Sequence, residues 1–108
     1  MKIKYSKKHL RAIEKKLHNF ELLFLDKKYF YKFEYYGFGE YLICLSVDNK
    51  CDNCILNRCD GLGSTYSNLK IVIDEYSKTK NFKLLLKYAK IRYKWIINKL
   101  NENGFDYK

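Results

Sequence analysis

Proline is absent from this chain of 108 residues, and glycine occurs only five times. Flexible linkers and turns are rich in these two residues, so a long disordered linker is not expected. No stretch approaches the roughly 18 consecutive apolar residues that a membrane-spanning helix needs. The sequence therefore predicts a single domain covering residues 1–108, with no membrane-spanning segment.

A secretory address is also missing. The first eleven residues are cationic, but no apolar segment of about 7–15 residues follows them, as it would in a signal peptide. We therefore expect a cytoplasmic protein, in a compartment where cysteine thiols stay reduced. In such a compartment, clustered cysteines indicate a metal site before they indicate disulfides.

No catalytic motif is present. The chain has no glycine-rich phosphate loop, no His-Glu-x-x-His pair and none of the paired motifs of the zinc deaminases. Its acidic residues are scattered, and no set of residues fills the roles of nucleophile, base and transition-state stabiliser. The sequence is typical of a binding protein, and we do not expect an enzyme.

Acidic residues are few, with 12 against 22 basic residues, which gives a net charge of +10. The charge is uneven: residues 1–19 carry a net +6, residues 20–60 a net −2 and residues 61–108 a net +6. A charge of this size exceeds what solubility requires, so it points to a polyanionic or acidic partner.

The four cysteines of the chain fall within sixteen residues, as Cys44-x6-Cys51-x2-Cys54-x4-Cys59. Four thiolates bind one Zn²⁺ tetrahedrally in a closed structural site that leaves no position for a reacting water. We therefore predict a structural zinc ion held by a loop at 44–63. An iron–sulfur cluster would also accept four thiolates, although the spacing differs from common ferredoxin patterns, and disulfides are the remaining alternative.

Helical periodicity accounts for most of the remaining chain. Ser6 is a good N-cap, and apolar residues then recur at spacings of three and four along residues 7–25. Lys8, Arg11 and Lys15 fall on the opposite face of this helix. Further helices are predicted for 67–78 and 81–101.

The last helix has an unusual pattern. Its lysines form one narrow stripe at spacings of three and four: Lys80, Lys83, Lys87, Lys90 and Lys94. Apolar residues cover roughly two-thirds of the remaining circumference, which is far wider than the stripe of an ordinary surface helix. Such a helix must lie between other elements or lend part of its face to a partner, and a homodimer through this apolar face is one form that partner can take.

Residues 26–43 are too rich in aromatic side chains to show a clean period. A short helix and a strand both remain open there, including a short β-hairpin near 33–47. We expect a mainly α protein, with three or four helices around the four-cysteine zinc loop.

Two functions follow from the charge. In the first, the lysine stripe and the basic residues Lys8, Arg11 and Lys15 bind the backbone of a nucleic acid, or a complex that handles nucleic acid. Lysines outnumber arginines nineteen to three, which suits phosphate contacts more than the reading of bases. In the second, the basic faces and the wide apolar helix dock onto an acidic protein or a ribonucleoprotein.

The cysteine region also resembles that of small phage or mobile-element proteins. The matching segments, about a quarter of the chain, are LICL at 42–45, CDNCIL at 51–56, CDG at 59–61 and TY at 65–66. Those proteins carry C-x-L-C, C-x-x-C-P-[IL] and C-x-G-T-P-Y before a helical tail, and this chain lacks both prolines and one cysteine of the first pair. The resemblance implies an inhibitor of host defence, such as an anti-CRISPR protein, that acts in the host cytoplasm by protein contact.

Overall fold

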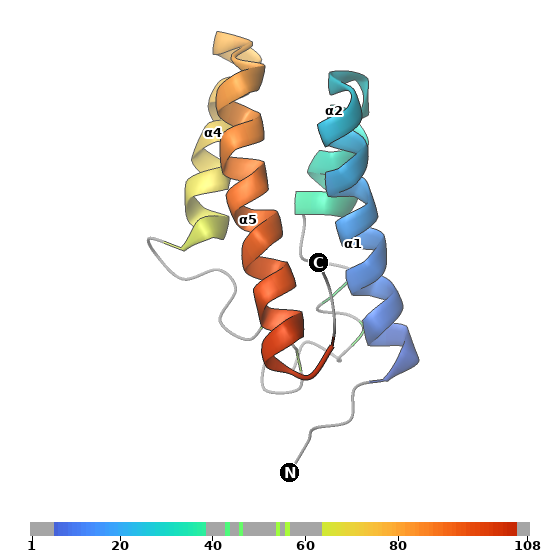
Figure 1. The fold of residues 1–108 in the computed structure, drawn as a ribbon. Helices are drawn as coiled ribbons and strands as arrows, with labels where there is room; N and C mark the ends of the chain where they lie inside the picture. The colour runs from blue at the N-terminus through green and yellow to red at the C-terminus, as the bar shows by residue number, and fades with distance from the viewer. Residues whose placement is uncertain are drawn as a thin grey trace.

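The computed structural model of the protein describes residues 6–38, 43, 46, 54, 56 and 64–105. These residues are mainly helical, as the sequence predicted, and the part of the chain that is described contains no strand. The elements are α1 (Lys7–Leu25), η1 (Lys27–Tyr29), α2 (Phe30–Lys32), η2 (Phe33–Phe38), α4 (Thr65–Thr79) and α5 (Phe82–Glu102) (Figure 1).

Each long helix begins at a side chain that accepts a hydrogen bond from the first turn. The Ser6 hydroxyl accepts from the His9 backbone N–H at 3.1 Å, and the Ser64 hydroxyl accepts from Ser67 at 3.1 Å. The Asn81 side-chain oxygen accepts from Leu84 at 3.1 Å. Because these caps satisfy backbone donors that the helix itself leaves open, the three helices start within two residues of the predicted positions.

The short β-hairpin considered near 33–47 is wrong for residues 33–38, which form the π-helical turn η2. The remaining residues of that hairpin lie mostly outside the described part of the chain. The Asp26 carboxylate accepts from the Lys28 backbone N–H at 2.9 Å and starts a helical segment instead. Gly37 lies so close to α1 and Phe33 that an added Cβ would approach the Phe33 ring to 2.8 Å, which explains the glycine.

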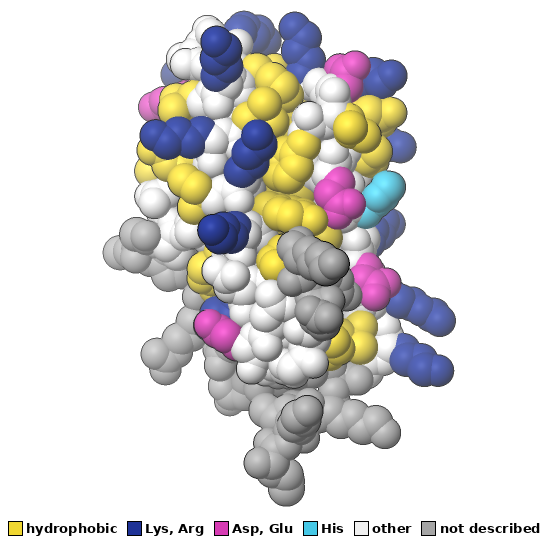
Figure 2. All heavy atoms as spheres, in the orientation of Figure 1, with side chains coloured by type: hydrophobic (Ala, Val, Ile, Leu, Met, Phe, Trp, Pro, Cys, Tyr) yellow, Lys and Arg dark blue, Asp and Glu magenta, His cyan; other side chains and the backbone are white. Residues whose placement is uncertain are grey.

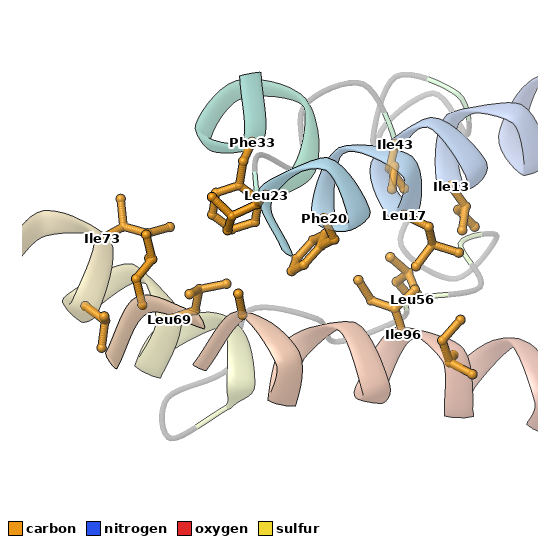
Figure 3. Packing of buried hydrophobic residues seen from close by; sticks show 14 of the residues in the cluster. Ile13, Leu17, Phe20, Leu23, Phe33, Ile43, Leu56, Leu69, Ile73 and Ile96 are labelled. Carbon is orange, nitrogen blue, oxygen red and sulfur yellow. The ribbon is translucent and has the colours of Figure 1, made fainter. Parts of the chain in front are cut away.

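The helices enclose one apolar core, with Phe20 of α1 near its centre (Figure 3). The Phe20 ring meets the Phe33 ring of η2 edge-on at 4.9 Å and lies 6.0 Å from the Tyr93 ring of α5. Leu69 and Ile73 bring α4 into the same core. Edge-to-face ring pairs add stability beyond the burial of their area, so α1 holds α5 and η2 in one unit.

The wide apolar arc of α5 is largely covered within the chain, because α4 packs along one side of the helix and α1 along another. Of its apolar residues, Ile91 is the large side chain that stays exposed, at 44%. The expectation that this helix must be sandwiched is therefore met internally. The width of the arc no longer argues for a homodimer.

Candidate polyanion-binding surface and metal loop

Four lysines form a row on the exposed side of α5: Lys83, Lys87, Lys90 and Lys94. We call them the α5 lysine row. Eleven residues of helix separate the first from the last, so the row extends for about 16 Å. Lys80 is a correction to the predicted stripe, because it lies in the turn before α5 as the left-handed C-cap of α4.

No carboxylate neutralises the α5 lysine row within the described residues, where the ion pair is Lys99 with Glu102 at 3.7 Å. The described residues hold 17 of the 22 basic and seven of the 12 acidic residues. The five basic and five acidic residues elsewhere cancel, so the described part of the chain carries the whole net charge of +10. Unpaired lysines on such a surface produce a positive potential that attracts anions.

An apolar seam runs beside the row, between α5 and α1 (Figure 2). The rings of Phe24 and Tyr93 meet there at 5.4 Å, and the Lys90 ammonium lies 6.0 Å from the centre of the Phe24 ring. The Tyr93 hydroxyl donates to the Glu21 carboxylate at 3.0 Å, and burial together with this bond raises the pKa of Tyr93. Figure 2 shows basic side chains on the α5 side of the seam and acidic side chains on the α1 side.

The basic residues predicted on α1 do not extend this row. Lys8, Arg11 and Lys15 are exposed, as expected. However, the Lys15 ammonium lies over the Tyr36 ring at 4.3 Å, on the side of α1 that faces η2. Since Glu21 occupies the side that faces α5, the two basic groups form separate surfaces.

Two buried cations were not foreseen. The Lys16 side chain is 1% exposed, and its ammonium donates to the backbone carbonyls of Gly37 and Phe38. Arg92 is 0% exposed, donates to the Thr65 hydroxyl at 3.0 Å and lies 4.3 Å from the centre of the Trp95 ring. Both occupy apolar positions of their helices, since Lys16 follows Ile13 by three residues and Arg92 follows Ala89 by three. That spacing was the available signal.

His9 is the third buried polar group that sequence reasoning set aside. Its Nδ1 lies 2.8 Å from the Ser46 hydroxyl, which donates its own proton to the Ile43 carbonyl at 2.6 Å. Nδ1 therefore carries the proton and donates to Ser46. Burial lowers the pKa of His9 below its ordinary value of 6.5, so the imidazole is neutral at pH 7.

We expect acid to destabilise the protein partly through His9. Between pH 6.5 and the lower folded pKa, the unfolded chain binds a proton that the folded chain does not, so the free energy of unfolding falls as pH drops. Urea denaturation at several pH values between 7.5 and 5.5 measures this slope. A His9→Asn variant keeps a donor near Ser46 without titrating and should have a shallower slope. Equal slopes in the two proteins would contradict the assignment.

Of the predicted metal ligands, Cys54 is described, whereas Cys44, Cys51 and Cys59 lie outside the described residues. The Cys54 side chain is partly buried against the core, and its Sγ accepts a hydrogen bond from the Leu56 backbone N–H at 3.3 Å. Donation to sulfur favours the thiolate form, and backbone N–H groups commonly support metal-bound thiolates in this way. The environment of Cys54 therefore fits a metal ligand.

Comparison with known proteins found no matching family model, curated protein or solved structure. Within the described residues, no helix is both long enough and apolar enough to cross a lipid bilayer.

Proposed function

We propose that the protein is a non-catalytic, cytoplasmic binding protein whose α5 lysine row contacts the phosphate backbone of a nucleic acid. One observation carries the proposal: four exposed lysines follow one side of a rigid helix, with no described carboxylate within ion-pair distance. Duplex DNA presents a phosphate every 3.4 Å along each strand, so a row of about 16 Å meets several phosphates.

The chemistry of lysine determines what kind of binding this is. An ammonium group is a compact point charge without the planar, bidentate geometry by which arginine reads guanine. The row therefore tracks backbone charge and discriminates little between sequences. The half-buried rings of Phe24 and Tyr93 beside it offer apolar contact to sugars or splayed bases.

The second part of the proposal is a structural zinc ion held by Cys44, Cys51, Cys54 and Cys59. Bound zinc would cross-link the segment between η2 and α4. The hydrogen bond from Leu56 to Cys54 supports it, as does the position of Leu56, whose side chain is buried in the core and points toward Ile96 in Figure 3. The cysteines are thus expected to position the helices.

A matched pair of charge-reversal variants tests the α5 lysine row. Lys83→Glu, Lys87→Glu and Lys90→Glu together should weaken binding to a single-stranded oligonucleotide at least about a hundredfold, measured by fluorescence anisotropy at about 50 mM salt. In the wild-type protein, affinity should fall steeply with salt, and loss of three phosphate contacts should reduce the log–log slope by about 2.

The control reverses the same charge on the other basic surface, with Lys8→Glu, Arg11→Glu and Lys15→Glu. We expect it to weaken binding much less than the α5 variant does. Equal losses would mean that net charge alone attracts the nucleic acid. No binding of the wild-type protein to single- or double-stranded DNA or RNA at about 50 mM salt would refute the proposal.

A protein partner is the second candidate function, and the apolar seam between α5 and α1 favours it. An apolar strip with basic side chains on one side and acidic ones on the other matches the mixed chemistry of protein interfaces better than that of phosphate backbones. In that case the protein would act by direct contact, as an inhibitor of a host defence enzyme or as a component of a nucleic-acid-handling complex. Tyr93→Ala would then impair capture of the partner while the salt-dependent binding of oligonucleotides stayed absent.

A further inference from the structure

A pocket of about 400 Å³ lies away from the α5 lysine row, between the segment Lys27–Glu34 and the C-terminal half of α4. Its lining comes from η1, α2, η2, α4 and the turn after α4, and it includes no residue of α5. The rings of Phe30 and Tyr76 meet across it at 4.7 Å. The volume is within the range of small-molecule sites.

Four charged side chains line this pocket without pairing. Lys27 and Lys80 bring ammonium groups, and Glu34 and Asp74 bring carboxylates. None of the four side chains makes an ion pair or a hydrogen bond with any residue in the described ranges 6–38 and 64–105. Donors for an anion and acceptors for an amine therefore remain available around one apolar floor.

The backbone at Lys80 is a second, independent observation. Lys80 has φ 54°, and it is the non-glycine residue with positive φ in the described chain. Glycine is the usual residue at such a C-cap, because a side chain there costs about 1 kcal/mol. The chain instead has a lysine, whose ammonium lies 6.0 Å from the centre of the Tyr76 ring.

Tyr31 adds an unused aromatic surface at the pocket. Its side chain is 81% exposed and meets the Phe30 ring edge-on at 5.8 Å. An exposed ring beside cationic groups is the arrangement by which proteins stack a single nucleobase.

We propose that this pocket binds one nucleoside monophosphate unit, with a base that carries an exocyclic amino group. The base stacks on the exposed Tyr31 ring above the Phe30–Tyr76 floor. Lys80 and Lys27 hold the phosphate, and the carboxylates of Asp74 and Glu34 accept hydrogen bonds from the amino group, as carboxylates do with cytosine. The net charge of +10 concentrates anions near the protein and favours a phosphate ligand over a neutral one.

Calorimetric titration of the full-length protein with small ligands tests the class of ligand. We expect cytidine monophosphate to bind at least about tenfold more tightly than uridine monophosphate, which has no amino group for the carboxylates. Ribose 5-phosphate should bind more weakly than either. Equal binding of ribose 5-phosphate and cytidine monophosphate, or binding of phenylalanine in place of the nucleotide, would overturn the proposal. So would the absence of nucleotide binding at about 5 mM ligand.

Two variants locate the site. Tyr31→Ala removes a ring that the core does not use, and Lys80→Gly removes the ammonium while relieving the positive φ, so both proteins should fold. Each should weaken cytidine monophosphate at least about tenfold. The matched controls Tyr35→Ala and Lys78→Ala alter exposed residues outside the pocket and should leave the affinity unchanged. Unaltered binding in both pocket variants would refute the site.

This inference is separable from the proposed function of the α5 lysine row. Reversal of Lys83, Lys87 and Lys90 should abolish oligonucleotide binding but leave the pocket able to take the mononucleotide. A protein that binds oligonucleotides but no mononucleotide refutes the pocket alone. The opposite result refutes the α5 lysine row alone.

Discussion

A Cys54→Ser variant is expected to lose roughly 4 kcal/mol or more of unfolding free energy. The reason is that metal-binding energy is folding energy in a small protein, where the hydrophobic core by itself gives a narrow margin. Serine cannot supply a thiolate, so the proposed zinc site would keep three ligands. Leu56, whose backbone N–H donates to Cys54 Sγ, is 0% exposed, so loosening the loop also loosens part of the core. Urea denaturation measures the loss.

Metal analysis and chelation provide the controls for this prediction. The purified wild-type protein should contain one zinc per chain, and a strong chelator should lower its stability by about as much as the substitution does. The same chelator should have little further effect on Cys54→Ser. Unchanged stability in the variant would contradict a structural metal, and an analysis that finds iron would replace zinc with an iron–sulfur centre.

Lys16→Ala is expected to cost roughly 3–5 kcal/mol, a large loss for a single lysine. The Lys16 ammonium donates to the carbonyls of Gly37 and Phe38, which close the π-helical turn η2 against α1. Removing it leaves two buried acceptors unsatisfied, at about 1–3 kcal/mol each, and opens a void beside Phe20. Thermal or urea denaturation measures the change.

The adjacent residue gives a matched control. Lys15 is exposed and contacts the outside of the Tyr36 ring, so Lys15→Ala should change stability by less than about 1 kcal/mol. Similar effects for Lys15→Ala and Lys16→Ala would mean that Lys16 is not buried in solution. Selective loss of η2, seen as faster amide exchange at 33–38 in Lys16→Ala, would support its role in holding that turn.

The starts of the long helices could be predicted because their determinants are local. Ser6 and Asn81 each accept from a backbone N–H three residues later, and that contact requires no other part of the chain. The exposed faces were also predictable: Lys83, Lys87, Lys90 and Lys94 share one side of α5 because of the helical period alone. The cysteine spacing likewise predicts a metal site by itself.

Other features depended on contacts between distant segments. The aromatic residues of 26–38 have no period, and they became helical against α1, where Phe33 meets Phe20 and Gly37 meets Asn19. The separation of Lys15 from the α5 lysine row depends on which side of α1 faces η2. The pocket was not predictable either, because Tyr31 and Lys80 are 49 positions apart and meet only when α2 packs beside α4.

The sequence by itself determined where the helices begin, which lysines share the exposed side of α5 and which residues can bind a metal. Only the tertiary structure decided that Lys16 and Arg92 are buried cations, that α4 and α1 cover the apolar arc of α5, and that four unpaired charges line one pocket. The physical reason is range. Capping and helical periodicity act over three or four residues, whereas burial of a charge and closure of a pocket depend on the groups that distant segments bring to it.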